Sequence, residues 1–214
     1  MQLNPMSPGR FLLIMTTLLC ACGAHAAHIL ARDGATRYRV VTPASPSAAD
    51  AFAARELAAF LKQSTGAEFA IVTEARLPAD VPSLYLGQTA FAEGQGIDFS
   101  SFGREESLIR TIGNDIVFCG GQPRGALYAV YDFLEEEVGC RWLDEQTEVV
   151  PELNVLEIGR LTDRHQPAFW YRDVYTAQHN VWGTGGDGRF LLRNKGSRGG
   201  GEGAGIPHHG SPGA

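Results

Sequence analysis

Hydrophobic and polar residues fall into runs along residues 28–160 that predict short strands separated by two longer helices. Residues 108–112 and 115–119 flank Gly113-Asn114 and predict a hairpin, because Gly and Asn tolerate the positive φ of a tight turn. Further short apolar runs predict strands over residues 38–42, 69–73, 83–87 and 154–158.

The two helices show the spacing of amphipathic elements with recognisable ends. In the first, Ser45 is the expected N-cap and Pro46 the first helical residue, and Gly66 follows its last turn. The second begins at Arg124, and its predicted buried stripe is Leu127, Val130, Tyr131, Leu134 and Val138. Its residues 135–137 are expected to form a solvated acidic face. This order of elements predicts an α/β (α+β) fold, a two-layer sandwich of a mixed sheet with two helices on one face.

The first 26 residues carry the three parts of an export signal. Arg10 precedes an apolar run over residues 11–22, and Ala24-His25-Ala26 supplies the small-x-small pattern that signal peptidase cleaves. The run is shorter than the roughly 20 apolar residues that cross a bilayer, so we expect a secreted or periplasmic protein with no membrane span. The alternative is a lipoprotein, because Leu19-Cys20-Ala21-Cys22 resembles a lipobox with Cys22 as the lipidated residue.

Composition and charge exclude several classes of protein. The 214 residues include 18 Lys+Arg and 24 Asp+Glu, a formal net charge of -6, which does not favour a nucleic acid partner. A hydrophobic content of 44% is too high for a wholly disordered chain. A complete (β/α)₈ barrel of roughly 250 residues does not fit.

Signal cleavage leaves two cysteines, Cys119 and Cys140. In an oxidising compartment they are candidates for a disulfide, which would close a loop of about 20 residues. The alternative is a pair of buried thiols.

Other motifs with a chemical meaning lack the context that the chemistry needs. The Gly183-Thr-Gly-Gly-Asp-Gly188 run matches G-x-G-x-x-G without the following helix of a dinucleotide site, and His208-His209 lacks the spacing of a zinc site. We therefore expect no cofactor and no metal. Gly120-Gly121, before the second helix, reads as a tight strand-to-helix turn or as an anion site at the helix N-terminus. The glycine-rich residues 183–214 are expected to be a disordered tail.

A set of short motifs together resembles a known domain. It resembles the N-terminal domain of the α-glucuronidases of glycoside hydrolase family 67 and their secreted relatives, and β-hexosaminidases carry a similar domain before their barrel. The resemblance covers roughly residues 28–175. The motifs are Glu-Leu-Ala-x-Phe-Leu at 56–61, Thr65-Gly66, Leu86-Gly87, Arg124-Gly-Ala-Leu-Tyr128, Tyr131-Asp-Phe-Leu-Glu135 and Gly139-Cys-Arg-Trp142.

The resemblance implies a division of the chain into a non-catalytic α/β domain over residues 28–160 and the start of a truncated barrel over residues 161–182. Residues 167–175 look like the first barrel strand, and Arg172 and Asp173 in it are implied to contact a sugar hydroxyl or carboxylate. A guanidinium suits the carboxylate of a uronic acid. The alternative role for Arg172 and Asp173 is a structural ion pair at the domain junction.

The resemblance further implies a part in the breakdown of polysaccharides such as xylan, with a carbohydrate partner that bears uronic acid. Glycoside hydrolysis needs two carboxylates, which in that family come from later barrel strands, so this chain alone is expected to be inactive. An apolar surface patch around Trp142, Phe169 and Trp170 would indicate a missing barrel partner. The alternative is a stand-alone carbohydrate-binding or interaction module that uses a sheet face or the turn at residues 120–125.

Overall fold

The computed structural model describes residues 27–144, 146–172 and 189–196. The export signal and lipobox, Asp173, the G-x-G-x-x-G run at 183–188 and His208-His209 therefore lie outside the described residues. Within the described ranges, no helix combines the length and the apolar character needed to cross a membrane.

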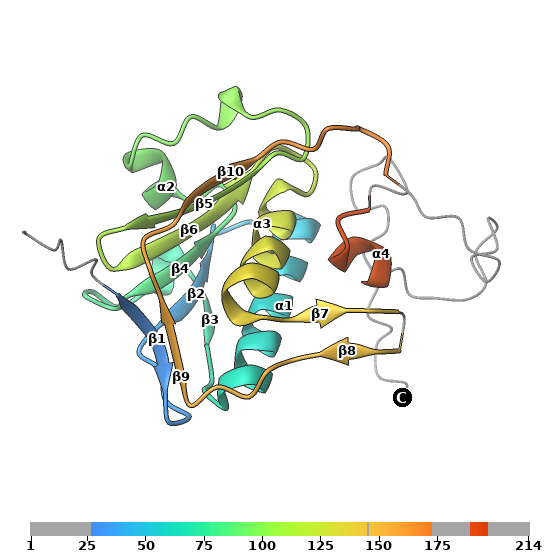
Figure 1. The fold of residues 1–214 in the computed structure, drawn as a ribbon. Helices are drawn as coiled ribbons and strands as arrows, with labels where there is room; N and C mark the ends of the chain where they lie inside the picture. The colour runs from blue at the N-terminus through green and yellow to red at the C-terminus, as the bar shows by residue number, and fades with distance from the viewer. Residues whose placement is uncertain (1–26, 145, 173–188, 197–214) are drawn as a thin grey trace, which may run out of the picture.

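A six-stranded mixed sheet forms the centre of the fold (Figure 1). Its strand order is β10-β5-β6-β4-β2-β3. Strands β3, β2, β4 and β6 run parallel to one another, and β5 and β10 pair antiparallel at one side. The strands span Arg39–Thr42 (β2), Ile71–Thr73 (β3), Ser83–Leu86 (β4), Ser107–Ile112 (β5), Asp115–Gly120 (β6) and Thr162–His165 (β10). The mixed sheet and the hairpin at Gly113-Asn114 are confirmed.

Helix α1 spans Ala48–Thr65 and begins later than its sequence predicts. Its N-cap is Ser47 rather than Ser45, because the hydroxyl of Ser47 accepts a hydrogen bond from the backbone N–H of Asp50 at 3.1 Å. Gly66 ends the helix as predicted, with a φ of 72° and an N–H that donates to the carbonyl of Lys62.

Helix α3 spans Gly125–Phe133 and continues into a π-helical turn, η3, over Leu134–Val138. All five residues of its predicted apolar stripe are buried. Of the predicted acidic face, Glu136 is exposed and Glu135 and Glu137 are half-buried. Gly139 ends η3 with a φ of 90°.

The sheet has a core on each face. Helices α1 and α3 cover one face, where their apolar side chains pack with Val40, Leu84 and Phe118 of the strands. The opposite face holds a smaller core around Val41, Tyr85 and Val117. Two short elements cover it: α2, over Ala90–Gly94, and η2, over Phe99–Ser101. Both elements are too short to show a periodic hydrophobic pattern in the sequence.

Two small ribbons and a short helical turn complete the fold. Strand β1, over His28–Arg32, pairs antiparallel with β9, over Val155–Ile158, so the strand predicted at 154–158 exists but lies outside the six-stranded sheet. Strand β7, over Arg141–Trp142, pairs with β8, over Glu148–Val149. The turn η1 spans Glu74–Arg76.

The α/β unit extends beyond its predicted end at residue 160. Strand β10 pairs with β5 through the whole of Thr162–His165, so these residues belong to the sheet and not to the start of a barrel. Residues 167–172 form no strand, which contradicts the predicted barrel strand over the described part of 167–175.

Cys119 and Cys140 are both free and both buried, so the predicted disulfide is wrong and the two-thiol alternative holds. The cause is topological. Cys119 belongs to the core under α2 and Cys140 to the core under α1 and α3, and the sheet lies between them. Burial raises the pKa of the Cys119 thiol to about 12 and that of Cys140 to about 11.

Part of the predicted disordered tail is ordered. Residues Arg189–Arg193 form a short helix, α4, and Leu192 is buried in the core on the α1/α3 side. The prediction of disorder over 183–214 is therefore wrong for residues 189–196. A single buried leucine and several ion pairs hold this helix, and neither creates a periodic sequence signal.

Candidate functional site: an arginine–glutamate junction

The buried carboxylate of Glu105 lies at the centre of the site, in the loop between η2 and β5. Its side chain is 1% exposed. Nη2 of Arg124 lies 2.7 Å from Oε1 of Glu105, and Nη2 of Arg172 lies 2.6 Å from Oε2. Each carboxylate oxygen therefore accepts from a different guanidinium, which is the pairing that a buried charge requires.

Helix α3 carries Arg124 and an aromatic ring that contacts both arginines. Arg124 is the N-cap residue of α3, and its side chain is 2% exposed. One turn further on, the ring of Tyr128 lies below both guanidinium groups, 5.8 Å from that of Arg124 and 5.5 Å from that of Arg172. Burial raises the pKa of the Tyr128 hydroxyl to about 12. The phenol therefore stays protonated and donates to the carbonyl of Gly196 at 2.7 Å.

Arg172 uses the rest of its guanidinium to hold backbone. Nε donates to the carbonyl of Lys195 at 2.8 Å, and Nη1 donates to the carbonyl of Phe169 at 2.6 Å. The sequence-predicted site residue therefore ties together three segments: the 102–106 loop, the chain leaving β10 and the end of α4. Arg172 thus forms an ion pair with Glu105, whereas Asp173, its partner in the alternative that the sequence left open, lies outside the described residues. Contact of Arg172 with a sugar stays a prediction.

The turn before α3 is filled by protein backbone. A β-carbon on Gly121 would lie 1.8 Å from the carbonyl oxygen of Gly103, and one on Gly120 would lie 2.0 Å from that of Glu106. The N–H of Gly121 donates to the carbonyl of Glu106 at 2.8 Å. The 102–106 loop thus occupies the space that an anion would need, and the tight-turn interpretation holds.

A second ion pair fastens β10 beside the same loop. Nε of Arg164 lies 2.6 Å from Oε1 of Glu106, whose other oxygen accepts from the N–H of Gly103 at 2.7 Å. The hydrogen bond from Arg164 lowers the pKa of Glu106 below its usual range. The Arg104-Glu105-Glu106 run looks like an ordinary charged loop in the sequence, so nothing there marks Glu105 as a buried residue.

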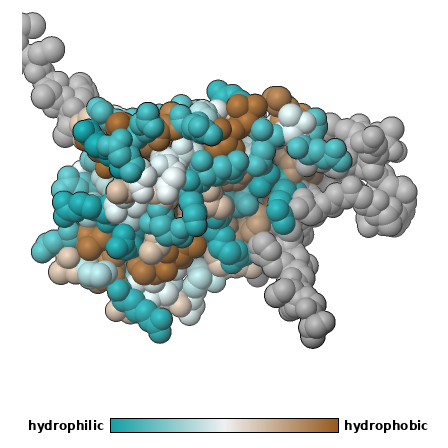
Figure 2. All heavy atoms as spheres, turned by 90° about the horizontal axis from the view of Figure 1, so that it is seen from below, coloured by the Kyte–Doolittle hydropathy of each residue, from teal (hydrophilic) through white to brown (hydrophobic). Residues whose placement is uncertain are grey.

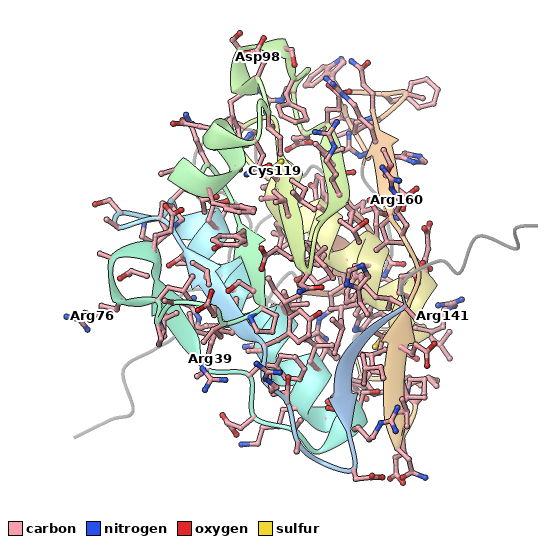
Figure 3. The ribbon with its side chains drawn as sticks, turned by 90° about the vertical axis from the view of Figure 1, so that its left-hand side faces the viewer. Arg39, Arg76, Asp98, Cys119, Arg141 and Arg160 are labelled. Atoms are coloured by element: carbon pink, nitrogen blue, oxygen red, sulfur yellow. The ribbon has the colours of Figure 1, made fainter. Side chains whose placement is uncertain are left out.

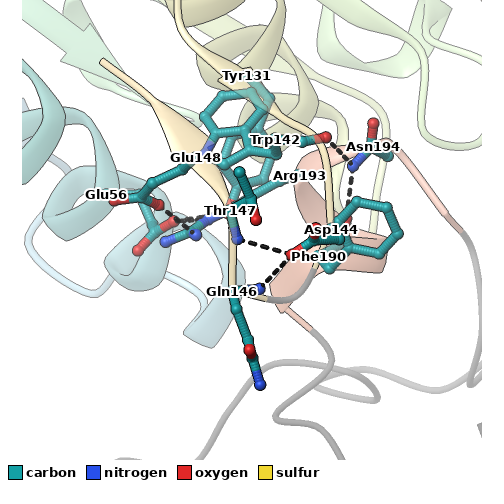
Figure 4. Close-up of polar contacts among 10 residues, drawn as sticks. All are labelled: Glu56, Tyr131, Trp142, Asp144, Gln146, Thr147, Glu148, Phe190, Arg193 and Asn194. Atoms are coloured by element: carbon teal, nitrogen blue, oxygen red, sulfur yellow. Dashed lines mark hydrogen bonds and ion pairs between the residues drawn. The ribbon is translucent and has the colours of Figure 1, made fainter. Parts of the chain in front are cut away.

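Helix α4 docks against α1, α3 and the β7–β8 ribbon through Arg193 (Figure 4). Nε of Arg193 lies 3.0 Å from Oε2 of Glu56, and Nη1 lies 3.0 Å from Oε2 of Glu148. The hydroxyl of Tyr131 donates to the same Glu56 oxygen at 3.1 Å. Trp142 packs edge-on against Tyr131, with ring centroids 5.4 Å apart, and the Arg193 guanidinium lies 5.9 Å from its ring.

The predicted apolar patch is divided between the interior and the surface. Trp142 is buried, whereas Phe169 and Trp170 are 73% and 77% exposed. Tyr171, which the sequence did not single out for this patch, is 56% exposed. These three consecutive aromatic residues directly precede Arg172, which is paired with Glu105.

The side chains at this junction hold separate segments of the chain together. Both oxygens of Glu105 accept from guanidinium groups, so the carboxylate is poorly placed to take up a substrate proton. Over the ranges that the structure describes, no group of three or more His, Cys, Asp or Glu side chains is placed to hold a metal ion.

Distant structural neighbours of the chain are glycoside hydrolases. One is a family GH115 4-O-methyl-α-glucuronidase with specificity for decorated arabinogalactans, with a TM-score of 0.47 and 16% identity over 68% of this chain and 19% of that one. Another is a GH138 enzyme targeting pectin rhamnogalacturonan II, with a TM-score of 0.32 and 19% identity over 46% of this chain and 13% of that one. The chain thus spans less than a fifth of either enzyme. No protein-family model and no curated protein matches the sequence.

Proposed function

We propose that this chain is a non-catalytic α/β domain of an exported, α-glucuronidase-like glycoside hydrolase that takes part in polysaccharide breakdown. The observation that carries the proposal is the three-way anchor of Glu105, Arg124 and Arg172. This anchor fixes the chain where it leaves the domain, which is what a domain needs when it positions a following one.

The residues behind the family resemblance support this role, because they build the anchor. Arg124 and Tyr128, from one motif, contact Arg172 and Gly196. Tyr131 and Trp142, from two others, pack against each other under α4. The motifs that resemble α-glucuronidase domains therefore converge on the segments that follow the α/β unit.

The exposed aromatic residues support a neighbour on this side of the molecule. Three consecutive aromatic side chains, those of Phe169, Trp170 and Tyr171, are exposed to solvent. A domain that covered them would remove this apolar surface from water. Arg172 donates to the carbonyl of Phe169, which holds the backbone at the start of this aromatic run.

Reading the gene through and beyond codon 214, in all three forward frames, tests the proposal. We expect a frame that continues with strand–helix repeats and acidic residues at strand ends, together with no hydrolysis of glucuronoxylan by the chain alone. A stop in every frame, or release of sugar by the purified chain, would overturn it.

The alternative is a stand-alone carbohydrate-binding module, and the same exposed aromatic side chains favour it because such rings stack on sugars. The Trp170→Ala variant separates the two roles. Loss of polysaccharide binding by the variant, from a gene that ends at codon 214, would establish the module; unchanged binding would exclude this surface as the sugar site.

A further inference from the structure

A groove with a volume of about 950 Å³ lies at the other end of the sheet from the junction. Strand β6 connects the two places: it begins at Asp115, which lines the groove, and ends at Gly120, beside the Glu105 loop. Figure 1 shows the β5–β6 turn beside the start of β1, and residues of both elements line the groove. Its walls come from β1, the connection between β1 and β2, the loop before β4, the β5–β6 turn and α2. This volume suits a small ligand or a short oligomer.

His28 lines the groove from β1 and is 8% exposed. Its imidazole forms no hydrogen bond with the residues in 27–144, 146–172 and 189–196, and its ring nitrogens are not among the fully enclosed unpaired atoms of this part of the chain. The imidazole is therefore open to a hydrogen bond from a ligand in the groove.

Asp115 is a hydrogen-bond acceptor in the wall of the groove. Its Oδ1 accepts from the N–H of Ser83 at 2.8 Å. Burial raises its pKa, and the charge of His28 acts in the opposite direction, so the two side chains lie within electrostatic reach of each other. Tyr38, also in the wall, is buried, and the charge of Asp115 helps to raise the pKa of its phenol.

Two guanidinium groups and a second carboxylate, that of Asp80, also line the groove. Arg32 and Arg37 both face the groove, and neither forms an ion pair with any part of the chain that the structure describes. An uncommitted guanidinium binds a carboxylate through two parallel hydrogen bonds. The groove therefore combines sites for an anion with acceptors for hydroxyl groups.

We propose that this groove binds an acidic saccharide. The uronate carboxylate pairs with Arg32 and Arg37, and its ring hydroxyls hydrogen-bond to Asp115 and His28. The choice of a saccharide among hydroxylated carboxylates rests on the proposed function. The carboxylate and hydroxyl complementarity rests on the residues of the groove alone.

Titration calorimetry on the full chain tests this, with a glucuronate-substituted xylo-oligosaccharide as the acidic probe and the unsubstituted xylo-oligosaccharide as the neutral one. We expect the acidic probe to bind about tenfold more tightly or better, because a hydrogen bond to a charged group adds roughly a factor of ten or more in affinity. We expect Arg37→Gln and Arg32→Gln each to weaken the binding of the acidic probe about tenfold.

Arg76→Gln is the matched control, because Arg76 lies in η1, is exposed and does not line the groove (Figure 3). It should leave binding unchanged. Equal affinity for the two probes, no binding by a chain whose circular dichroism shows it to be folded, or an equal loss in Arg76→Gln would each overturn the proposal. A gene that stops at codon 214 overturns the proposed function and leaves this titration unaffected, so the two failures are distinguishable.

Discussion

Nη2 of Arg172 lies 2.6 Å from Oε2 of Glu105, although 67 positions separate them in the sequence. Glu105 is almost fully buried and Arg172 is 21% exposed, so the pair joins the interior of the domain to the segment that leaves it. Because Arg124 shares the same carboxylate, two guanidinium groups depend on one buried acid. Removal of that acid leaves two positive charges close together.

We therefore expect Glu105→Gln to lower the free energy of unfolding by about 3 kcal/mol, the usual cost of leaving a buried charge without its partner. Arg172→Gln should cost less, because Arg124 still neutralises the carboxylate and Arg172 is partly solvated. Urea denaturation followed by circular dichroism measures both.

The control for this pair is Glu68→Gln, which breaks the exposed ion pair between Glu68 and Lys62. Side chains in that pair are 58% and 71% exposed, so the change should stay within about 0.5 kcal/mol. Equal effects of Glu105→Gln and Glu68→Gln would show that the junction carboxylate is not buried in solution.

The turn before α3 gives a steric prediction. Gly121→Ala should destabilise the domain by about 3 kcal/mol, because the new methyl group would overlap the carbonyl oxygen of Gly103. Gly94→Ala in α2 has open space around its β-carbon and should instead stabilise by about 0.5 kcal/mol. Thermal unfolding measures both variants in parallel. A shift of their melting temperatures in the same direction would contradict the described turn.

The two thiols should be present and unreactive in the folded protein. At pH 8 iodoacetamide should modify Cys119 and Cys140 about a hundredfold more slowly than in concentrated urea, since burial raises both pKa values and only the thiolate reacts. Peptide mass spectrometry after timed alkylation measures each site. Recovery of a peptide that links Cys119 to Cys140 would contradict the described arrangement.

Periodicity predicted the parts of the fold that bury a long apolar face. The stripe of α3 could be read from the spacing of its apolar residues, and the hairpin from the two apolar runs that flank Gly113-Asn114. Strand β10 could not, since all four residues of Thr162–His165 are exposed, and backbone pairing with β5 together with the Arg164–Glu106 ion pair holds the strand. Helix α2 is likewise too short for a repeat to show.

The site was harder to predict than the fold, for a physical reason. Arg172 could be singled out beside aromatic residues, yet its partner Glu105 sits in a charged loop that looks solvated. The pairing depends on a contact across the fold, and no local pattern encodes it. The same holds for the cysteines, where only the position of the sheet between them decides against a bridge.

Helix α4 should open before the rest of the domain. Arg193→Gln removes the ion pairs to Glu56 and Glu148 and leaves Leu192 as the principal apolar contact of α4. We expect amide hydrogen exchange over residues 189–196 to accelerate about tenfold, with the exchange of α1 unchanged. Arg160→Gln, an exposed change outside the cluster, should leave both rates as they are. Equal acceleration in α1 would show instead that α4 unfolds only with the whole domain.

Asp50 gives the domain a pH dependence whose sign can be stated. Its carboxyl is buried in the first turns of α1, and burial raises its pKa while hydrogen bonds from Ser47 partly oppose this. A raised pKa means that the folded state binds the proton more tightly than the unfolded state, whose value is near 3.8. The contribution of this group is therefore fully present below that value and is lost as the pH rises through the folded pKa.

The test compares the free energies of unfolding of the wild type and of Asp50→Asn. The value for the wild type minus that for the variant should increase as the pH falls from 7 toward 4. Other titrating groups cancel in this difference, which urea denaturation at several pH values measures. Asp98→Asn gives the opposite sign, because hydrogen bonds from Ser100 lower the pKa of Asp98 and its contribution disappears as the pH falls. If this difference changed with pH in the same direction for both variants, burial would not control the pKa of Asp50. Only a raised pKa makes the folded state bind the proton at a higher pH than the unfolded state does.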